Sequence, residues 1–199
     1  METDLELLNA ARTLDKDALV KIFDLYSAAL YNYALRLTGD PVAADHVVGD
    51  VFVKLLEQFS TGSGPVTNLR SYLYQTVYHL IVDEQRSSRH TIPLDVALWI
   101  RPDAHSSLVG LENRIMFEGV LGAIQNDLTD DQRHVMILRY LEGFSLRETA
   151  AIMGITAGHV KVIQHRAVEK IRQVLKYDEI MTTVSCSNAQ KVSRALSLR

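Results

Sequence analysis

Residues 145–174 constrain the fold of this chain more than any other segment does. Their pattern predicts a short helix, a tight turn at Gly154 and a longer helix that begins at Ala157. Ser145 and Glu148 have the Ser-x-x-Glu spacing of a capping box, in which each side chain satisfies a backbone amide of the other residue. Gly154 can end the first helix because glycine adopts the left-handed conformation without steric cost. The segment therefore predicts two helices joined by a short glycine turn.

Such a pair is typical of the helix-turn-helix unit, which places its second helix in the major groove of DNA. Thr156 can cap this second helix, and Val160, Ala167 and Ile171 give it one apolar face. Between residues 157 and 176 the chain carries five Lys and Arg residues against a single Glu. A solvated amphipathic helix would also have a basic face, so that face alone decides little. The complete capped unit favours DNA binding.

The charge of the chain is unevenly distributed along its length. The chain has 199 residues, 47% of them hydrophobic, which suits one or two compact domains. Residues 1–60 carry five basic and ten acidic side chains, whereas residues 144–199 carry nine basic and four acidic ones. An acidic N-terminal part and a basic C-terminal part indicate two surfaces with different partners.

Composition also argues against several classes of protein. Cys186 is the only cysteine, which excludes an intrachain disulfide and a cysteine-based metal cluster. No run of about 18 apolar residues is present, and the N-terminus lacks a basic segment followed by an apolar one. We therefore expect a cytoplasmic protein without direct membrane insertion. No nucleophile–base pair or metal-ligand spacing stands out, so we expect neither an enzyme nor a cofactor or metal.

Nearly every periodic segment of the chain predicts a helix, so the expected fold class is all-α. Apolar residues recur at helical spacing over residues 16–37, with Phe23 in the predicted stripe. A Gly-Asp-Pro sequence ends that helix, because Asp40 can cap, and Pro41 can open, a second helix over about 41–58. The other predicted helices cover residues 68–88, 111–126 and 129–141.

The helices are expected to form two small domains joined by a linker. Residues 90–110 contain two prolines and several Ser and His without a sustained period, which predicts a linker. Thr129 and Gln132 form a second capping box, which opens the helix before the helix-turn-helix. The predicted domains are 1–89 and 111–177, followed by a tail, 178–199, to which no role is assigned.

Four segments, in order, resemble those of a small sigma factor of bacterial RNA polymerase, of the extracytoplasmic-function type. They are YALRLTGD (33–40), ADHVVGDVF (44–52), LRSYLYQTVYHLIVDEQR (69–86) and residues 144–175. The resemblance implies that domain 1–89 binds the polymerase clamp and reads the minus-ten promoter element. It also implies that domain 111–177 reads the minus-thirty-five element.

Residues 44–52 are similar to the acidic segment that docks on the clamp helices of the polymerase. The resemblance assigns polymerase contacts to Asp45, His46, Gly49 and Asp50. The two aspartates could pair with Arg or Lys of the polymerase. His46 and Gly49 stand where the family usually has an acidic residue and Gln.

Residues 69–86 resemble the helix that opens the DNA at the minus-ten element. Aromatic side chains beside basic ones suit this role, because unstacked bases stack on aromatic rings at about 1–3 kcal/mol each. The implied residues are Tyr72, Tyr74, Tyr78, His79, Asp83, Arg86 and Arg89. His79 stands where the family usually has an Asn that helps to hold a flipped base. Alternatively, tyrosines such as Tyr74 are core residues whose hydroxyl groups reach water.

Residues 144–175 resemble the helix-turn-helix that reads the minus-thirty-five element. The implied contacts to base edges come from Ala157, His159, Lys161, Val162 and His165, and those to phosphates from Thr156 and Arg166. Residues 162–164 differ from the family's usual small-polar, Arg, aliphatic run, which lowers the number of DNA contacts.

The leading hypothesis is a transcription initiation factor that binds core RNA polymerase and directs it to specific promoter DNA. The polymerase would carry out the catalytic chemistry. The resemblance also implies control by an anti-sigma protein or an equivalent regulator. The alternative is a conventional helix-turn-helix regulator that binds an operator without polymerase. That alternative leaves residues 33–40 and the tyrosine-rich segment unexplained.

Overall fold

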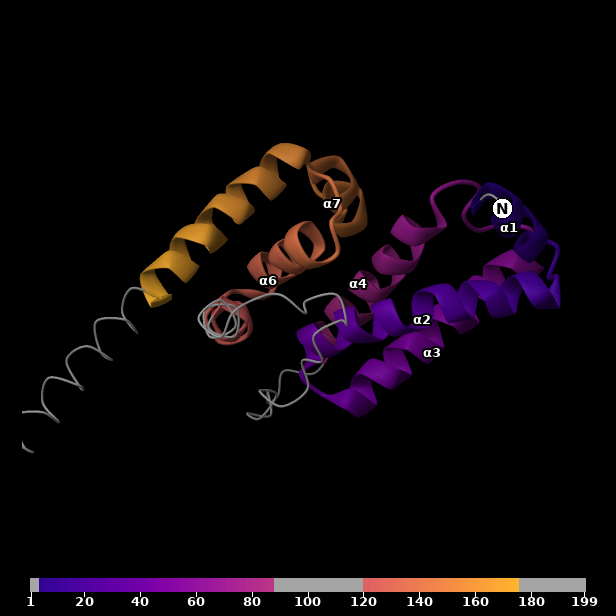
Figure 1. The fold of residues 1–199 in the computed structure, drawn as a ribbon, viewed down its shortest axis with the longest axis horizontal. Helices are drawn as coiled ribbons and strands as arrows, with labels where there is room; N and C mark the ends of the chain where they lie inside the picture. The colour runs from indigo at the N-terminus through magenta and orange to yellow at the C-terminus, as the bar shows by residue number, and fades with distance from the viewer. Residues whose placement is uncertain (1–3, 88–119, 176–199) are drawn as a thin grey trace, which may run out of the picture. The chain divides into compact units, whose positions relative to one another are not determined.

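The computed structural model of the chain describes residues 4–87 and 120–175. Within these ranges every regular element is a helix, which confirms the all-α fold class. The helices are α1 (Asp4–Arg12), α2 (Lys16–Thr38), α3 (Pro41–Ser60), α4 (Leu69–Ser87), α6 (Asp130–Met136), η1 (Ile137–Leu141) and α7 (Leu146–Met153), with two further helical segments at 120–126 and 157–175 (Figure 1). The predicted linker 90–110 and tail 178–199 lie outside the described residues, as does most of the predicted helix 111–126.

The chain divides into two compact units. One is built from residues within 1–99 and 137–160, and the other from residues within 100–136 and 161–199. The first unit therefore contains both the N-terminal helices and the start of the helix-turn-helix. The two predicted domain ranges, 1–89 and 111–177, stay a prediction.

Helices α2, α3 and α4 pack against one another and enclose the core of the first unit (Figure 1). Large side chains with almost no exposed surface fill this core: Ile22, Leu30, Tyr33, Val51, Leu55, Leu73 and Ile81. Full burial of one such apolar side chain contributes about 1.5–3 kcal/mol. The apolar stripes of the three long helices therefore supply most of the stability of this unit.

Helix α1 also belongs to this unit and was not predicted from the sequence. It contacts α2 and α3 and buries Leu8 and Ala11. Nine residues give barely two and a half helical turns, which is too short for a periodic pattern to be distinctive. The position of α1 therefore depends on its packing against α2 and α3, which no local sequence pattern shows.

The predicted break between α2 and α3 is confirmed. Gly39 has φ 69°, and its amide donates to the carbonyl of Leu35 at 2.9 Å. Asp40 then accepts a hydrogen bond from the amide of Val42 at 2.9 Å, and Pro41 occupies the first helical turn. A left-handed glycine followed by an acidic cap thus reverses the chain between the two helices.

The prediction that Phe23 belongs to the buried stripe of α2 is wrong, because its side chain is exposed. Successive helical residues point about 100° apart, so Ile22 and Phe23 cannot both face the centre of the core. Ile22 takes the central position. Phe23 instead contacts Phe52 of α3 at the margin of the bundle, with ring centroids 4.8 Å apart.

The helix predicted over 129–141 is present, but its last turn is a π-helix. Its capping box is confirmed, since the backbone amide of Thr129 donates to the side-chain oxygen Oε1 of Gln132 at 3.2 Å and the backbone amide of Gln132 donates to the Thr129 hydroxyl at 3.4 Å. In η1 the amide of Glu142 donates to the carbonyl of Ile137 at 3.0 Å, a bond that spans five residues instead of four. The helix therefore ends in a widened turn, directly before the segment 142–144.

Candidate nucleic-acid and polymerase interfaces

The capped helix–turn–helix geometry predicted for residues 145–174 is confirmed. The Ser145 amide donates to the Glu148 carboxylate at 2.8 Å, and the Glu148 amide donates to the Ser145 hydroxyl at 3.2 Å. The hydrogen bonds from Ser145 also lower the pKa of Glu148, which therefore stays charged at the N-terminus of α7. Gly154 has φ 66°, and the Thr156 hydroxyl accepts from the amide of His159 at 3.2 Å. Two caps and one glycine thus fix the turn.

The helix 157–175 presents most of the residues predicted to read the minus-thirty-five element. Val160, Ile163, Ala167 and Ile171 form its buried side. Six predicted residues are exposed and one, Ala157, is half-buried; the exposed ones are Thr156, His159, Lys161, Val162, His165 and Arg166. The departure at Ile163 from the family pattern therefore concerns a buried position, whereas the departure at Val162, which is 47% exposed, concerns the outer face.

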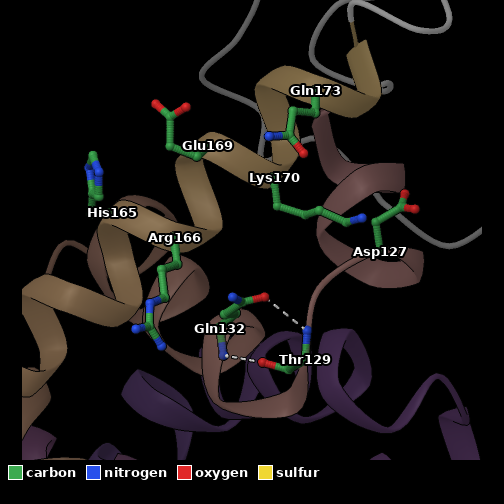
Figure 2. A pocket seen from close by; sticks show the side chains of 8 residues that line it. All are labelled: Asp127, Thr129, Gln132, His165, Arg166, Glu169, Lys170 and Gln173. Carbon is green, nitrogen blue, oxygen red and sulfur yellow. Dashed lines mark hydrogen bonds between the residues drawn. The ribbon is translucent and has the colours of Figure 1, made fainter.

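A hollow of about 460 Å³ lies beside this helix in the second unit. Figure 2 shows Gln132 and Thr129 on one side and His165, Arg166 and Lys170 on the helix opposite. Asp127 and Glu169 also line it, so two carboxylates stand beside the charged side chains of Arg166 and Lys170. Such a mixed lining gives the hollow no preference for an anion, and we assign it no ligand.

The residues predicted to contact the polymerase share the outer side of α3. Asp45, His46, Gly49 and Asp50 are all exposed, whereas Ala44, Val47, Val48 and Val51 are buried. A Cβ atom added at Gly49 would meet no heavy atom within 4 Å. The α3 surface is therefore open, and a larger side chain at position 49 would fit without a clash.

Helix α4 presents its predicted DNA-reading residues unevenly. His79, Asp83 and Arg86 are exposed, and Tyr72 and Tyr78 are half-buried. Tyr74, in contrast, is only 1% exposed. Arg89 lies outside the described residues. In this conformation Tyr74 cannot stack on a base, so its predicted DNA contact would require that the residues covering it move away.

Glu142 covers Tyr74 from one side and joins two helices of the bundle. The Tyr74 hydroxyl donates to one oxygen of the Glu142 carboxylate at 2.5 Å, and Arg36 of α2 donates to the other oxygen at 3.2 Å. Arg70 of α4 donates to the backbone carbonyl of Glu142. Burial, and then the charge of Glu142, raise the pKa of Tyr74 well above its ordinary value. The phenol therefore stays protonated and remains the donor.

Phe144 covers Tyr74 from a second side. It is 1% exposed, and its ring centroid lies 4.8 Å from that of Tyr74 in an edge-on arrangement. The guanidinium of Arg70 lies 4.0 Å from the centre of the Phe144 ring, which is the geometry of a cation–π contact. Tyr33 of α2 contacts the Tyr74 ring at 5.1 Å from within the core. None of these partners of Tyr74 was predicted from the sequence.

The second unit contains a buried basic pair, Arg133 and His134. Arg133 donates to the carbonyl groups of Ile124, Gln125 and Leu128, at 3.3, 2.8 and 3.3 Å, and so caps the end of the helix 120–126. Burial, followed by the charge of Arg133, lowers the pKa of His134 to about 3. His134 is therefore neutral near pH 7, and Arg133 has a structural role.

Two features are absent from the described ranges 4–87 and 120–175. No group of three or more His, Cys, Asp or Glu side chains there is placed to hold a metal ion. None of the helices in those ranges is both long enough and apolar enough to cross a membrane.

Comparison with protein families gives two matches, in order along the chain. Residues 22–91 match the family described as Sigma-70 region 2, and residues 126–173 match Sigma-70, region 4. The first match contains α3, α4 and α2 from residue 22 onward, and the second contains the helix-turn-helix.

Curated relatives extend these matches over most of the chain. The chain is 27% identical over 180 residues to "ECF RNA polymerase sigma factor BldN" of Streptomyces coelicolor, which covers 87% of this chain and 66% of that protein. It is also 27% identical over 158 residues to "ECF RNA polymerase sigma factor SigX" of Bacillus subtilis, covering 76% of this chain and 80% of the relative.

Two solved structures are similar in fold. One is the sigma factor RpoE in complex with the anti-sigma factor NepR from Bartonella quintana, with a TM-score of 0.58 and 25% identity, covering 79% of this chain and 96% of that one. The other is CnrH in complex with the cytosolic domain of CnrY, with a TM-score of 0.65 and 20% identity, covering 88% and 98%. At the latter identity the similarity shows the fold alone.

Proposed function

The chain belongs to the extracytoplasmic-function sigma factors, and we propose on this premise that it binds core RNA polymerase and directs it to specific promoters. The observation that carries the proposal is the presence of both sigma regions, in order, on one chain. A conventional operator-binding regulator would account for the region-4 match only. It would leave α2, α3 and α4 without a role.

The exposed side of α3 is the proposed polymerase-binding surface. Asp45 and Asp50 lie on it with their carboxylates open to solvent, so Arg or Lys residues of the polymerase can reach them. His46 and Gly49 complete this surface. Because this side of α3 is exposed while the opposite side packs in the core, a partner can bind without disturbing the bundle.

Two elements are proposed to read the promoter. The outer face of the helix 157–175 would bind the minus-thirty-five element, with Lys161 and His165 at base edges and Arg166 at a phosphate. Helix α4 would capture the opened strand at the minus-ten element through Tyr72, Tyr78, His79 and Arg86, joined by Tyr74 when that residue is uncovered. These roles assign polymerase and minus-ten binding to domain 1–89 and minus-thirty-five binding to domain 111–177.

The mechanism consists of binding and strand capture. The protein would act in the cytoplasm, without enzymatic activity of its own, and the polymerase would catalyse RNA synthesis. Control by an anti-sigma protein or an equivalent regulator is part of the proposal, because the RpoE relative of similar fold was solved with its anti-sigma factor.

Reconstituted transcription tests the proposal. Purified protein and core RNA polymerase are incubated with genomic DNA, and transcript start sites are mapped. We expect a set of starts that share two upstream sequence elements and that are missing when either protein is left out. If the chain gives no promoter-dependent transcript, but binds duplex DNA tightly without polymerase, the operator-binding regulator is correct instead.

A further inference from the structure

Residues 61–68 connect α3 to α4, and the first half of this α3–α4 connection lies against the end of α3. The amide of Ser63 donates to the carbonyl of Gln58 at 2.8 Å, and the Ser63 hydroxyl donates to the side-chain oxygen of Gln58 at 2.8 Å. Gly64 has φ 99°, and a Cβ atom at this position would lie 3.2 Å from the ring of the buried Phe59. The connection therefore leaves α3 along a defined path.

The second half of the α3–α4 connection is held by α4 and by α1. The side chain of Asn68 accepts a hydrogen bond from the amide of Ser71 at 3.1 Å, in the first turn of α4. Arg12, the last residue of α1, donates from its guanidinium to the carbonyl of Pro65 at 3.1 Å. Figure 1 shows α1 beside this part of the chain. The N-terminal helix thus supplies a fixed point for a segment 53 residues away.

The turn after α1 directs this helix back onto the bundle. The amide of Leu14 donates to the carbonyl of Ala11 at 2.9 Å, and Leu14 has φ 61°, a left-handed conformation that is unfavourable for a residue with a β-carbon. The Leu14 side chain is 47% exposed, so its own burial does not offset this strain. The offset must come from the packing of α1, in which Leu8 and Ala11 are buried, and from the bond of Arg12.

The bond between Arg12 and Pro65 is suited to hold a connection in one position. Proline has no amide proton, so the carbonyl is the one backbone hydrogen-bonding group of Pro65. A guanidinium is a charged donor, and Arg12 is half-buried, which makes the bond stronger than one between neutral groups in water. Val66 and Thr67, which follow, are exposed, so packing does not hold them. Without Arg12 the chain would gain freedom between Pro65 and α4.

The α3–α4 connection leads directly to the residues proposed to capture the opened strand. The amide of Tyr72 lies 3.3 Å from the carbonyl of Asn68, so the capping residue and the first predicted DNA-reading residue of α4 are joined by a hydrogen bond. A shift of Asn68 is therefore transmitted to Tyr72. The connection and α4 lie within the region-2 match, which begins at residue 22, whereas α1 lies outside it.

We propose that Arg12 is a positioning residue for promoter opening: by holding Pro65 it fixes the α3–α4 connection, so that α4 begins in the orientation that strand capture requires. This inference rests on the proposed sigma-factor function and adds to it a residue that does not touch DNA. It gives α1 a part in reading the minus-ten element, although none of the predicted DNA contacts lies on α1.

Substitutions of Arg12 test this role in the complex with core polymerase. Arg12→Met removes every donor but keeps an unbranched apolar stem, and we expect opening of a matching promoter to fall by about three- to tenfold. Arg12→Lys keeps a charged donor and should restore opening to within about twofold of the unsubstituted protein. Lys16→Met, the matched control, removes a positive charge from an exposed position at the start of α2 and should leave opening unchanged. Permanganate reactivity of unpaired thymines at the minus-ten element measures opening.

Affinity for core polymerase, measured on the same four proteins, separates positioning from folding. It should be equal in all of them, because the proposed polymerase surface on α3 does not include Arg12. If Arg12→Met loses polymerase affinity and opening to the same degree, Arg12 supports the whole unit and the positioning role is wrong. Equal opening by all four proteins, or equal losses in Arg12→Met and Lys16→Met, would also overturn it. If the unsubstituted protein opens no promoter, the sigma-factor function itself fails.

Hydrogen exchange of the free protein tests the position of the connection without polymerase or DNA. In Arg12→Met the amides of Ser71 and Tyr72, both bonded to Asn68, should exchange roughly tenfold faster. Amides in the core of α3, such as that of Val51, should keep their rates. Unchanged exchange at Ser71 and Tyr72, or equal acceleration throughout α3 and α4, would contradict the positioning role, whatever the outcome of the promoter experiment.

Discussion

The helix 157–175 and helix α4 are both expected to read DNA, yet they differ in what covers them. The outer face of the helix 157–175 is exposed along the predicted contact residues. On α4, Tyr74 and Arg70 are occupied by residues 142–144 of the same chain. Amphipathic spacing identifies which face of a helix is polar, but it does not show whether that face is free to bind.

The largest effect is expected at Phe144, on the covered side. Phe144→Ala removes a buried ring that touches Tyr74 and Arg70, so we expect the free energy of unfolding to fall by about 3–5 kcal/mol. Val162→Ala, on the exposed helix, should change it by less than about 0.5 kcal/mol. Urea denaturation followed by circular dichroism measures both. Similar small losses in the two variants would show that Phe144 is not part of a packed core.

The exposed helix should respond through DNA affinity instead of stability. Lys161→Ala is expected to cost about 1–3 kcal/mol of binding to the matching minus-thirty-five sequence and to relax the preference at one base position. Arg166→Ala should weaken binding to all sequences alike. It should also reduce by about 1 the slope with which the logarithm of the binding constant falls against the logarithm of the salt concentration. Binding of the polymerase complex to promoter variants at several salt concentrations separates the two. If Lys161→Ala also weakens binding to all promoter variants alike, then Lys161 contacts only phosphate.

Buried polar groups provide a third comparison, because Tyr74 and His134 are both neutral when folded. The pKa of His134 is about 3 in the folded protein against 6.5 for an ordinary histidine. Between these values the unfolded chain binds the extra proton, so stability falls as the pH falls below about 6.5, by about 1.4 kcal/mol per pH unit. The contribution of His134 is fully present above that pH.

The variant His134→Leu should show a flatter dependence of unfolding free energy on pH between about 6.5 and 5, measured by urea denaturation. Tyr74→Phe is the matched control, since the pKa of Tyr74 is raised and its phenol does not titrate in this range. If His134→Leu and the unsubstituted protein have the same slope, then His134 is protonated in the folded state.

The smallest effect is expected on the exposed side of α3. Gly49→Ala should stabilise the helix by about 0.5–1 kcal/mol, because alanine restricts the unfolded chain and no neighbour obstructs the added Cβ. Gly49→Gln should give a similar gain in stability and, in addition, a higher affinity for core polymerase. Binding titrations with both variants distinguish helix propensity from a new contact. Equal affinities would place position 49 outside the polymerase interface.

Features that depend on neighbouring residues could be predicted well from the sequence. Both capping boxes, the left-handed Gly154 and the break at Asp40 were predicted, because each depends on residues at most four apart. The bounds of α2, α3 and α4 followed from apolar periodicity for the same reason.

Features that depend on distant residues could not be predicted in this way. Glu142 lies 106 residues from Arg36 and 68 from Tyr74, so no local spacing relates them. The sequence left open whether Tyr74 stacks on a base or lies in the core, and its burial depends on Phe144. The π-helical turn at 137–141 also escaped prediction, since its residues are ordinary helix formers.

The enclosed phenol of Tyr74 makes the chain a chemical reporter of its own conformation. Reagents that iodinate or nitrate tyrosine attack the ionised ring, and burial beside a carboxylate suppresses that form in Tyr74. Tyr140, which is 54% exposed, should react readily. The ratio of modification at these two positions, read by mass spectrometry, would therefore report whether Tyr74 is covered, without any added label.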